Sequence, residues 1–268
     1  MATRSWLVSS PSTETLPSRP RLRVQLVGGE VSVEGHDGDD VVVEFLEVTG
    51  NPVEVVLDDA LLSVGYPSIG WEGWVKRLSS FRSSDVCRLR IRVPRHTTVS
   101  LATATAAVRV ERLEADPQLN SAAGTVYCDG VTGKTTARTF SGAITLDRQE
   151  GPVTAQSASG NVAVQGRTAH LGVSTASGKV SVRNAATASV MTVSTLAGSV
   201  DVTLPVTGLM LTARTVSGSV EVDGSSRRSS SGPTVVTVDE RGAGDACWLT
   251  VNTVSGALRV QRVGNDST

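Results

Sequence analysis

Apolar and polar residues alternate along most of this chain in short runs that return at a nearly fixed distance. Each run follows a Gly that stands three residues after a Ser or Thr, as in Thr139-Phe-Ser-Gly142-Ala-Ile-Thr-Leu146. The steps between these glycines are 18, 18, 18, 20, 20 and 38 residues. A short fixed period is typical of a solenoid, in which each repeat forms one coil. The repeat glycines are Gly124, Gly142, Gly160, Gly178, Gly198, Gly218 and Gly256.

Counting from each glycine predicts which side chains point inward. Apolar residues stand two and four positions after the Gly and five before it, and a Ser or Thr stands three before it. These positions share one face, because successive side chains of a strand point to opposite faces. We therefore expect an aliphatic interior with one hydroxyl per coil. We interpret the hydroxyl column as structural, since no His or carboxylate accompanies it as a base.

The pattern predicts an all-β fold, namely a parallel β-solenoid or β-helix of about eight 18–20-residue coils over residues 99–263. Residues 1–20 contain three prolines, and we expect an extended lead-in there. Residues 21–98 contain alternating runs without the period and are expected to form an N-terminal β-sheet cap, with antiparallel strands that cover the first coil. Residues 225–245 are interpreted as an insertion within the last coil, and residues 264–268 as a tail.

Composition agrees with thin stacked strands and argues against several classes of function. Aromatic residues make up 3% of the 268 residues, and the formal net charge is −1, so nothing attracts nucleic acid globally. Cys87, Cys128 and Cys247 have unrelated spacings, which argues against disulfides and zinc. The sequence has no signal-peptide core and no stretch of transmembrane length, so we expect a cytoplasmic protein.

One segment has the three-and-four spacing of an amphipathic helix instead of strand alternation. Its aromatic and aliphatic side chains would share one face, with basic residues beside that face. Two interpretations stay open: the segment packs over the cap, or it meets a partner or a membrane surface, although no anchor supports the membrane. The partner-binding candidates are Trp71, Trp74, Leu78, Phe81, Arg77 and Arg82.

Acidic residues five positions after the repeat slot are the best candidates for metal binding or acid–base chemistry. Glu111, Asp129 and Asp147 come from consecutive coils and would lie about one strand spacing, ~4.8 Å, apart. Three such carboxylates could hold Ca²⁺ or raise the pKa of one of them. Arg112 and Arg148 sit beside them, however, which favours a solvated column at the coil corners. We therefore predict no metal, no cofactor and no catalytic residue.

The Thr-x-Ser-Gly-x-Val-x-Val unit, together with an earlier strand that ends at Val93-Pro94, resembles the DUF4097 family of bacterial β-strand-repeat proteins, also described as candidate adhesins. The resemblance covers about residues 22–262 and implies a β-solenoid fold. It also implies a link to envelope-stress systems of Gram-positive bacteria, with which some members are associated. The composition looks actinobacterial. No catalytic residues are established for the family, so the resemblance implies none.

These observations predict a non-catalytic binding or scaffold protein. It would present a flat β-face or the aromatic segment to a protein partner or to a second copy of itself, because flat repeat surfaces suit extended binding. Two alternatives stay open. The first is a carbohydrate-active β-helix enzyme that uses the acidic column, and the second is a peripheral membrane sensor that uses the aromatic segment.

Overall fold

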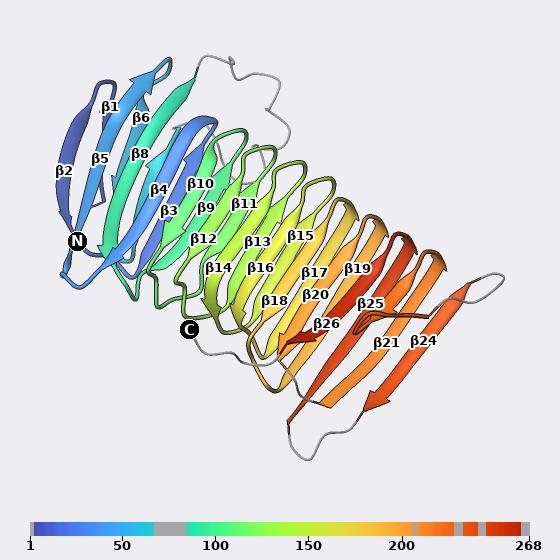
Figure 1. The fold of residues 1–268 in the computed structure, drawn as a ribbon. Coiled ribbons are helices and arrows are strands. Elements are labelled where there is room, and N and C mark those ends of the chain that lie inside the picture. Colours follow the sequence, from blue (N-terminus) through green and yellow to red (C-terminus); the bar gives the residue numbers. More distant parts are fainter. Residues whose placement is uncertain (1–2, 67–84, 206–207, 228–232, 241–244, 264–268) are drawn as a thin grey trace. The chain divides into compact units, whose positions relative to one another are not determined.

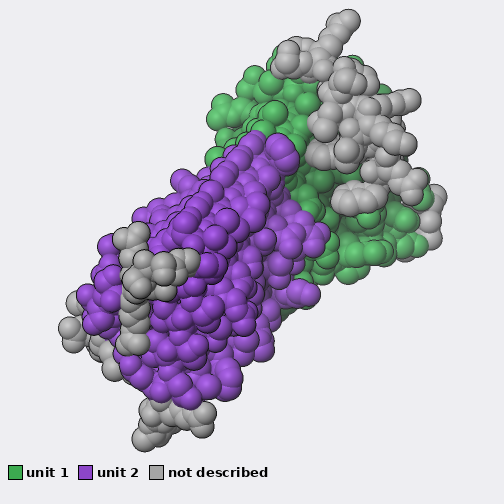
Figure 2. Space-filling view, turned by 90° about the vertical axis from the view of Figure 1, so that its right-hand side faces the viewer, with its two compact units in different colours: residues 1–133 green, residues 134–268 purple. Residues whose placement is uncertain are grey.

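The computed structural model describes residues 3–66, 85–205, 208–227, 233–240 and 245–263. The chain forms two compact units, residues 1–133 and residues 134–268, which are coloured green and purple in Figure 2. Every regular element in these ranges is a β-strand, so the predicted all-β fold with parallel solenoid sheets is confirmed. No helix in the described part of the chain has the length and hydropathy needed to span a membrane.

The described residues of unit 1 form twelve strands in two sheets. In sheet A the order is β1-β6-β7-β3-β9-β11, and in sheet B it is β2-β5-β8-β4-β10-β12. The strands are β1 (Arg4–Val8), β2 (Ser12–Pro17), β3 (Arg21–Leu26), β4 (Gly28–His36), β5 (Asp40–Thr49), β6 (Val53–Leu57), β7 (Leu61–Gly65), β8 (Val86–Pro94), β9 (Thr98–Thr103), β10 (Ala107–Glu111), β11 (Gln118–Ser121) and β12 (Val126–Asp129).

The N-terminal region differs from the cap that the sequence predicts. Strands β3 and β4 pair in parallel with β9 and β10, so the region 21–98 already contains a solenoid coil. The period is absent there because Leu22 pairs with Val99, far beyond an 18-residue step. Strands β7 and β8 also pair in parallel with β3 and β4. The expected lead-in, residues 1–20, supplies β1 and β2, which pair antiparallel with β6 and β5 at the sheet edges.

In unit 2, the residues that the structure describes form fourteen strands in two sheets. In sheet A the order is β13-β15-β17-β19-β25-β21-β24, and in sheet B it is β14-β16-β18-β20-β26-β22-β23. The strands are β13 (Thr135–Thr139), β14 (Ile144–Glu150), β15 (Val153–Ser157), β16 (Val162–Arg167), β17 (His170–Ser177), β18 (Val180–Asn184), β19 (Ser189–Ala197), β20 (Val200–Pro205), β21 (Gly208–Ser217), β22 (Val220–Val222), β23 (Ser225–Arg227), β24 (Thr234–Glu240), β25 (Ala246–Ser255) and β26 (Leu258–Val263).

The final coil of unit 2 does not stack at the end of the array. Strand β25 lies between β19 and β21 and is parallel to both, while β26 lies between β20 and β22 (Figure 1). Val251 therefore pairs with Val193 on one side and with Ala213 on the other. The expected insertion, residues 225–245, contains β23 and β24, which pair antiparallel with β22 and β21 and form the sheet edges.

The repeat positions fill the interior as the alternation predicts. Val162, Val164, Val180 and Val182 in two neighbouring coils are all buried. A glycine is needed at the corner because a Cβ at Gly160 would lie 1.9 Å from the carbonyl oxygen of Gly142. The repeat therefore requires apolar side chains of similar size on the inward face of each strand. At the corner where neighbouring coils meet, it requires a glycine.

The inward hydroxyls have two different environments in unit 2. In the first coils they cap the corner: the N–H groups of Gly142 and Gly160 donate to Thr139 Oγ1 and Ser157 Oγ at 2.9 and 2.8 Å. Further along, Gly198 N–H donates instead to the carbonyl oxygen of Ser255 at 3.1 Å. Among the described residues, three buried hydroxyls in these later coils have no hydrogen-bond partner, those of Thr195, Thr215 and Thr253.

Candidate functional site

The aromatic segment lies outside the residues that the structure describes. This applies to all six of its predicted partner-binding residues, Trp71, Trp74, Leu78, Phe81, Arg77 and Arg82. Their role as an interaction site stays a prediction.

The acidic candidates lie among arginines. Glu111 and Asp129 are paired in register on β10 and β12, and Arg109 Nε donates to Glu111 Oε1 at 2.9 Å. On the other side of Glu111 in the ladder lies Glu34, which forms an ion pair with Arg112. The third candidate, Asp147, belongs to unit 2 and lies in β14. Across the described ranges, no group of three His, Cys, Asp or Glu residues could hold a metal ion.

The three cysteines are buried and form no disulfide. Burial, with a smaller contribution from the nearby Glu47 carboxylate, raises the pKa of Cys87 to about 12. Burial also raises the pKa of Cys128, and the Asp129 charge adds to that effect. Both thiols therefore stay protonated at neutral pH, a state in which a thiol is a poor nucleophile.

Unit 2 exposes a set of large apolar side chains on the outer face of sheet A. Their exposed fractions run from 46% for Val254 to 63% for Val235. They lie on four neighbouring strands: Val190 and Leu196 on β19, Trp248 and Val254 on β25, Val216 on β21, and Val235 on β24. At the other end of the same sheet in unit 2, Phe140 follows β13 and is 70% exposed.

Strand register organises this face into two rows around the inward threonines. Thr195, Thr253 and Thr215 are aligned on β19, β25 and β21. The residues that follow them form an apolar row, Leu196, Val254 and Val216. The residues that precede them, with Ser174 on β17, form a polar row, Ser174, Ser194, Asn252 and Arg214.

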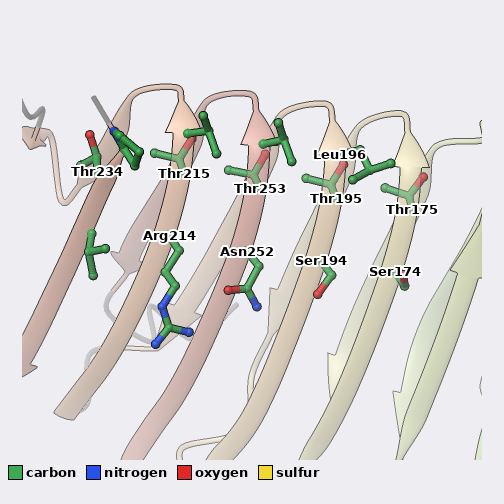
Figure 3. Close-up of a pocket in the computed structure, with 14 residues that line it drawn as sticks. Ser174, Thr175, Ser194, Thr195, Leu196, Arg214, Thr215, Thr234, Asn252 and Thr253 are labelled. Atoms are coloured by element: carbon green, nitrogen blue, oxygen red, sulfur yellow. The ribbon is translucent and has the colours of Figure 1, made fainter. Parts of the chain in front are cut away.

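A groove of about 410 Å³ runs across the strands along these two rows. Figure 3 shows Arg214, Asn252, Ser194 and Ser174 in line on four adjacent strands, beside the threonine column. A second hollow of about 620 Å³ shares Ser174 and Leu196 with the groove and continues over β15 and β13 to Arg138. One wall of this surface thus offers hydrogen-bonding groups, and the other offers aliphatic contact.

The groove carries little charge. Among the described residues that line it and its continuation, only Arg214 and Arg138 are charged, and Arg138 Nε donates to Gln156 Oε1 at 3.0 Å. In the described part of the chain, the lining of this surface contains no carboxylate, histidine or cysteine. The arrangement can bind a largely uncharged surface through apolar contacts and hydrogen bonds.

This groove was not predicted from the sequence, although one signal for it is present. The position two residues before the repeat glycine points outward and holds Ala in several coils, as at Ala122, Ala158 and Ala176. In the later coils the same position holds Leu196, Val216 or Val254. A change from small to large apolar residues at an outward position was the available sign of a binding face.

Comparisons with known proteins address the family and leave the ligand open. One similar solved structure is a candidate cell adhesion protein from Clostridium sporogenes, with 12% identity over 95% of this chain and 100% of that chain and a TM-score of 0.30. A second is a candidate lipid binding protein from Parabacteroides distasonis, with 11% identity over 95% of this chain and 97% of that chain and a TM-score of 0.43. A third is a candidate adhesin from Bacteroides fragilis, with 12% identity over 93% of this chain and 97% of that chain and a TM-score of 0.40. At these TM-scores the likeness carries no argument about function. No curated protein matches the chain. The family model described as Toastrack DUF4097 matches residues 15–261, and the chain therefore belongs to this family.

Proposed function

We propose that this protein is a non-catalytic binding protein that associates with a second copy of itself through the outer face of sheet A in unit 2. The observation that carries the proposal is the apolar row of Leu196, Val254 and Val216 on three adjacent strands. Three more half-exposed apolar side chains lie on the same face, those of Val190, Trp248 and Val235. Monomeric soluble proteins rarely expose contiguous apolar patches of more than a few hundred Å². Burial of this face against a second copy of the protein is therefore favourable.

The size of the face suits a dimer. Strands β17, β19, β25, β21 and β24, with a spacing of about 4.8 Å and a rise of about 3.3 Å per residue, give a face of roughly 600 Å². Two such faces would bury roughly 1,200 Å² in total, which is the lower end of the range for specific interfaces. Because Arg214 is the one charged side chain in the two rows, most of the face meets its copy without charge repulsion.

The sheet edges are poorer candidates for association. The edge strands of unit 1 carry Arg4 and Glu14, and the edge strands of unit 2 carry Arg227 and Glu240. Glu240 also forms an ion pair with Arg262 at 2.7 Å. Charged residues on an edge strand disfavour pairing with another chain, so we assign the interface to the face and not to an edge.

A test is available in the apolar row. Light scattering over a concentration range should give a dimer for the wild type. Leu196→Glu combined with Val254→Glu should weaken the dimer at least about 100-fold, because two carboxylates per copy would have to be buried without partners. Leu46→Glu, at an exposed position on β5 of unit 1, is the matched control and should leave the dimer intact.

Two results would contradict this function. One is a wild-type protein that stays monomeric at every concentration, and the other is a double variant that dimerises like the wild type. Far-UV circular dichroism of the variants confirms that the sheets are still formed.

The non-catalytic assignment draws its support from the buried thiols and from the arginines beside the acidic column. The carbohydrate-active alternative would require Glu111, Asp129 and Asp147 to act together. Calcium titration of a triple alanine variant against the wild type, followed by calorimetry, tests that alternative.

The cytoplasmic location, the envelope-stress link and the role of Trp71, Trp74 and Phe81 at membranes stay predictions of the sequence. Cell fractionation tests the location. Liposome flotation of the wild type against a Trp71→Ser, Trp74→Ser variant tests the membrane role.

A further inference from the structure

A separate groove of about 320 Å³ lies on sheet B of unit 2. Gln165, Arg183 and Thr203 are aligned in register on β16, β18 and β20, and they form its polar side together with Arg148. Pro205 and Val263 form an apolar side. None of the described residues that line it has an acidic side chain. Ligand pockets begin at about 300 Å³, so this volume suits a head group with a short apolar extension.

Many exposed arginines in the B sheets of the two units are matched by carboxylates, as in the pairs Arg92–Glu44, Arg109–Glu111 and Arg259–Glu221. Arg183 instead lies between a Gln and a Thr in the ladder and forms no ion pair with any described residue. Its guanidinium charge is therefore available to a ligand.

Arg148 adds a second guanidinium and an independent sign of function. Its backbone is in the left-handed region, with φ 47°, which a side chain with a β-carbon adopts only at a cost in free energy. The equivalent positions in the repeats before and after it hold Gly130 and Gly166, both with positive φ. Arg112 has the same strained conformation, with φ 55°, and its side chain pairs with Glu34. A strained residue at a glycine position suggests that its side chain is retained for a purpose.

The polar side of the groove suits a charged head group, and the apolar side suits an alkyl part of the same ligand. Guanidinium groups bind phosphate and carboxylate oxygens through paired, charge-assisted hydrogen bonds. The Gln165 amide and the Thr203 hydroxyl add neutral donors beside them. Val263 is half-exposed, so a ligand with an alkyl part next to its charged group would remove this apolar surface from water.

We propose that this groove binds a single-chain amphiphile with an oxyanion head group. Arg148 and Arg183 hold the head group, and the first carbons of the alkyl chain lie against Pro205 and Val263. The site is on the other sheet from the apolar groove, and it does not depend on the proposed self-association.

Calorimetry with three probes tests the ligand class. Hexyl phosphate combines both halves of the ligand, whereas inorganic phosphate lacks the chain and hexanol lacks the charge. The wild type should bind hexyl phosphate at least about tenfold more tightly than either of the other two probes, because burial of only a few methylene groups has this effect. Absence of measurable hexyl phosphate binding overturns the proposal. Equal affinity for inorganic phosphate overturns its apolar half.

Two variants and one control test the residues. Arg183→Gln should lower the affinity for hexyl phosphate at least about tenfold and leave the unfolding temperature unchanged. Arg148→Gly should lower the affinity similarly while the unfolding temperature stays the same or rises, since the backbone strain is relieved. Arg112→Gly changes a matched left-handed arginine and should keep full affinity. Wild-type affinity in Arg183→Gln, or loss of affinity in Arg112→Gly, contradicts the assignment.

Discussion

At the scale of single residues, the inward Ser or Thr of each coil does not have one fixed role. Thr139 accepts a hydrogen bond from the Gly142 N–H, whereas the equivalent Thr253 has no partner among the described residues. A buried polar group without a partner costs about 1–3 kcal/mol, and a hydrogen-bonded one contributes about 1 kcal/mol. The same residue type therefore stabilises one coil and destabilises another.

Valine substitutions separate these two roles, because Val has nearly the shape of Thr without its hydroxyl. Thr253→Val should raise the free energy of unfolding by about 1 kcal/mol. Thr139→Val should lower it by about 1–2 kcal/mol, since the Gly142 N–H loses its acceptor. Urea unfolding of both variants measures the two changes. If the variants shift the midpoint in the same direction, the difference between the two hydroxyls is contradicted.

An ion pair at the end of β22 should make stability depend on pH. Burial raises the pKa of Asp223, but hydrogen bonds and the charge of Arg262 outweigh burial and lower it overall. A carboxylate whose folded pKa is depressed stabilises the fold above its unfolded pKa, usually 3.8, and this contribution is lost as the pH falls through the folded value.

Asp223→Asn isolates this effect, because Asn tolerates the left-handed backbone that Asp223 has, with φ 48°. The variant should be less stable than the wild type by about 1 kcal/mol or less at pH 7, because the pair is partly exposed to solvent. The difference should shrink toward zero in a second measurement at acidic pH, below the folded pKa of Asp223. Urea unfolding at both pH values measures it, and a difference that does not change with pH would contradict the assigned ion pair.

At the scale of strands, the position of β25 and β26 inside the array makes them more important than edge strands. Strand β25 pairs with two neighbours, whereas β1 pairs only with β6. Loss of an inner strand leaves the backbone N–H and C=O groups of two neighbouring strands unpaired, and loss of an edge strand leaves those of one neighbour unpaired.

Two deletions at opposite ends of the chain compare these strands. Deletion of residues 245–268 should lower the unfolding temperature sharply and lower hydrogen-exchange protection in β19 and β21, because both lose their native neighbour and could at most pair with each other. Deletion of residues 1–17 should have the smaller effect, with exchange increased mainly in β5 and β6. Thermal unfolding and hydrogen exchange measure both deletions. Equal effects would contradict the difference between inner and edge strands.

At the scale of the whole molecule, periodicity predicts the interior of a coil better than the order of the coils. The inward positions were predictable because alternation is a local property, as at Val162 and Val164. The place of β25 was not predictable, since the repeat around Thr253 matches those around Thr195 and Thr215. Any of these coils could therefore stack on any other with the same register.

Both candidate sites depend on the spatial order of the coils. For this reason neither site could be predicted from the sequence. The apolar row exists because Val254 lies between Leu196 and Val216, although the three are far apart in the chain. The oxyanion groove likewise joins Arg183 to Val263 across several coils. The sequence alone does not show which coils are adjacent, and so it does not show which of their residues become neighbours.

The insertion of β25 also sets a constraint on how the chain reaches its native state. Residues 246–255 are synthesised after β21, yet they must lie between β21 and β19. Because β21 has the same repeat, it can pair with β19 while β25 is still missing, and this pairing must open again before β25 can enter. We expect the last step of folding to be slow and prone to trapping, as is common when parallel pairing joins distant segments. The regularity that stabilises each coil thus makes the wrong neighbour nearly as acceptable as the right one.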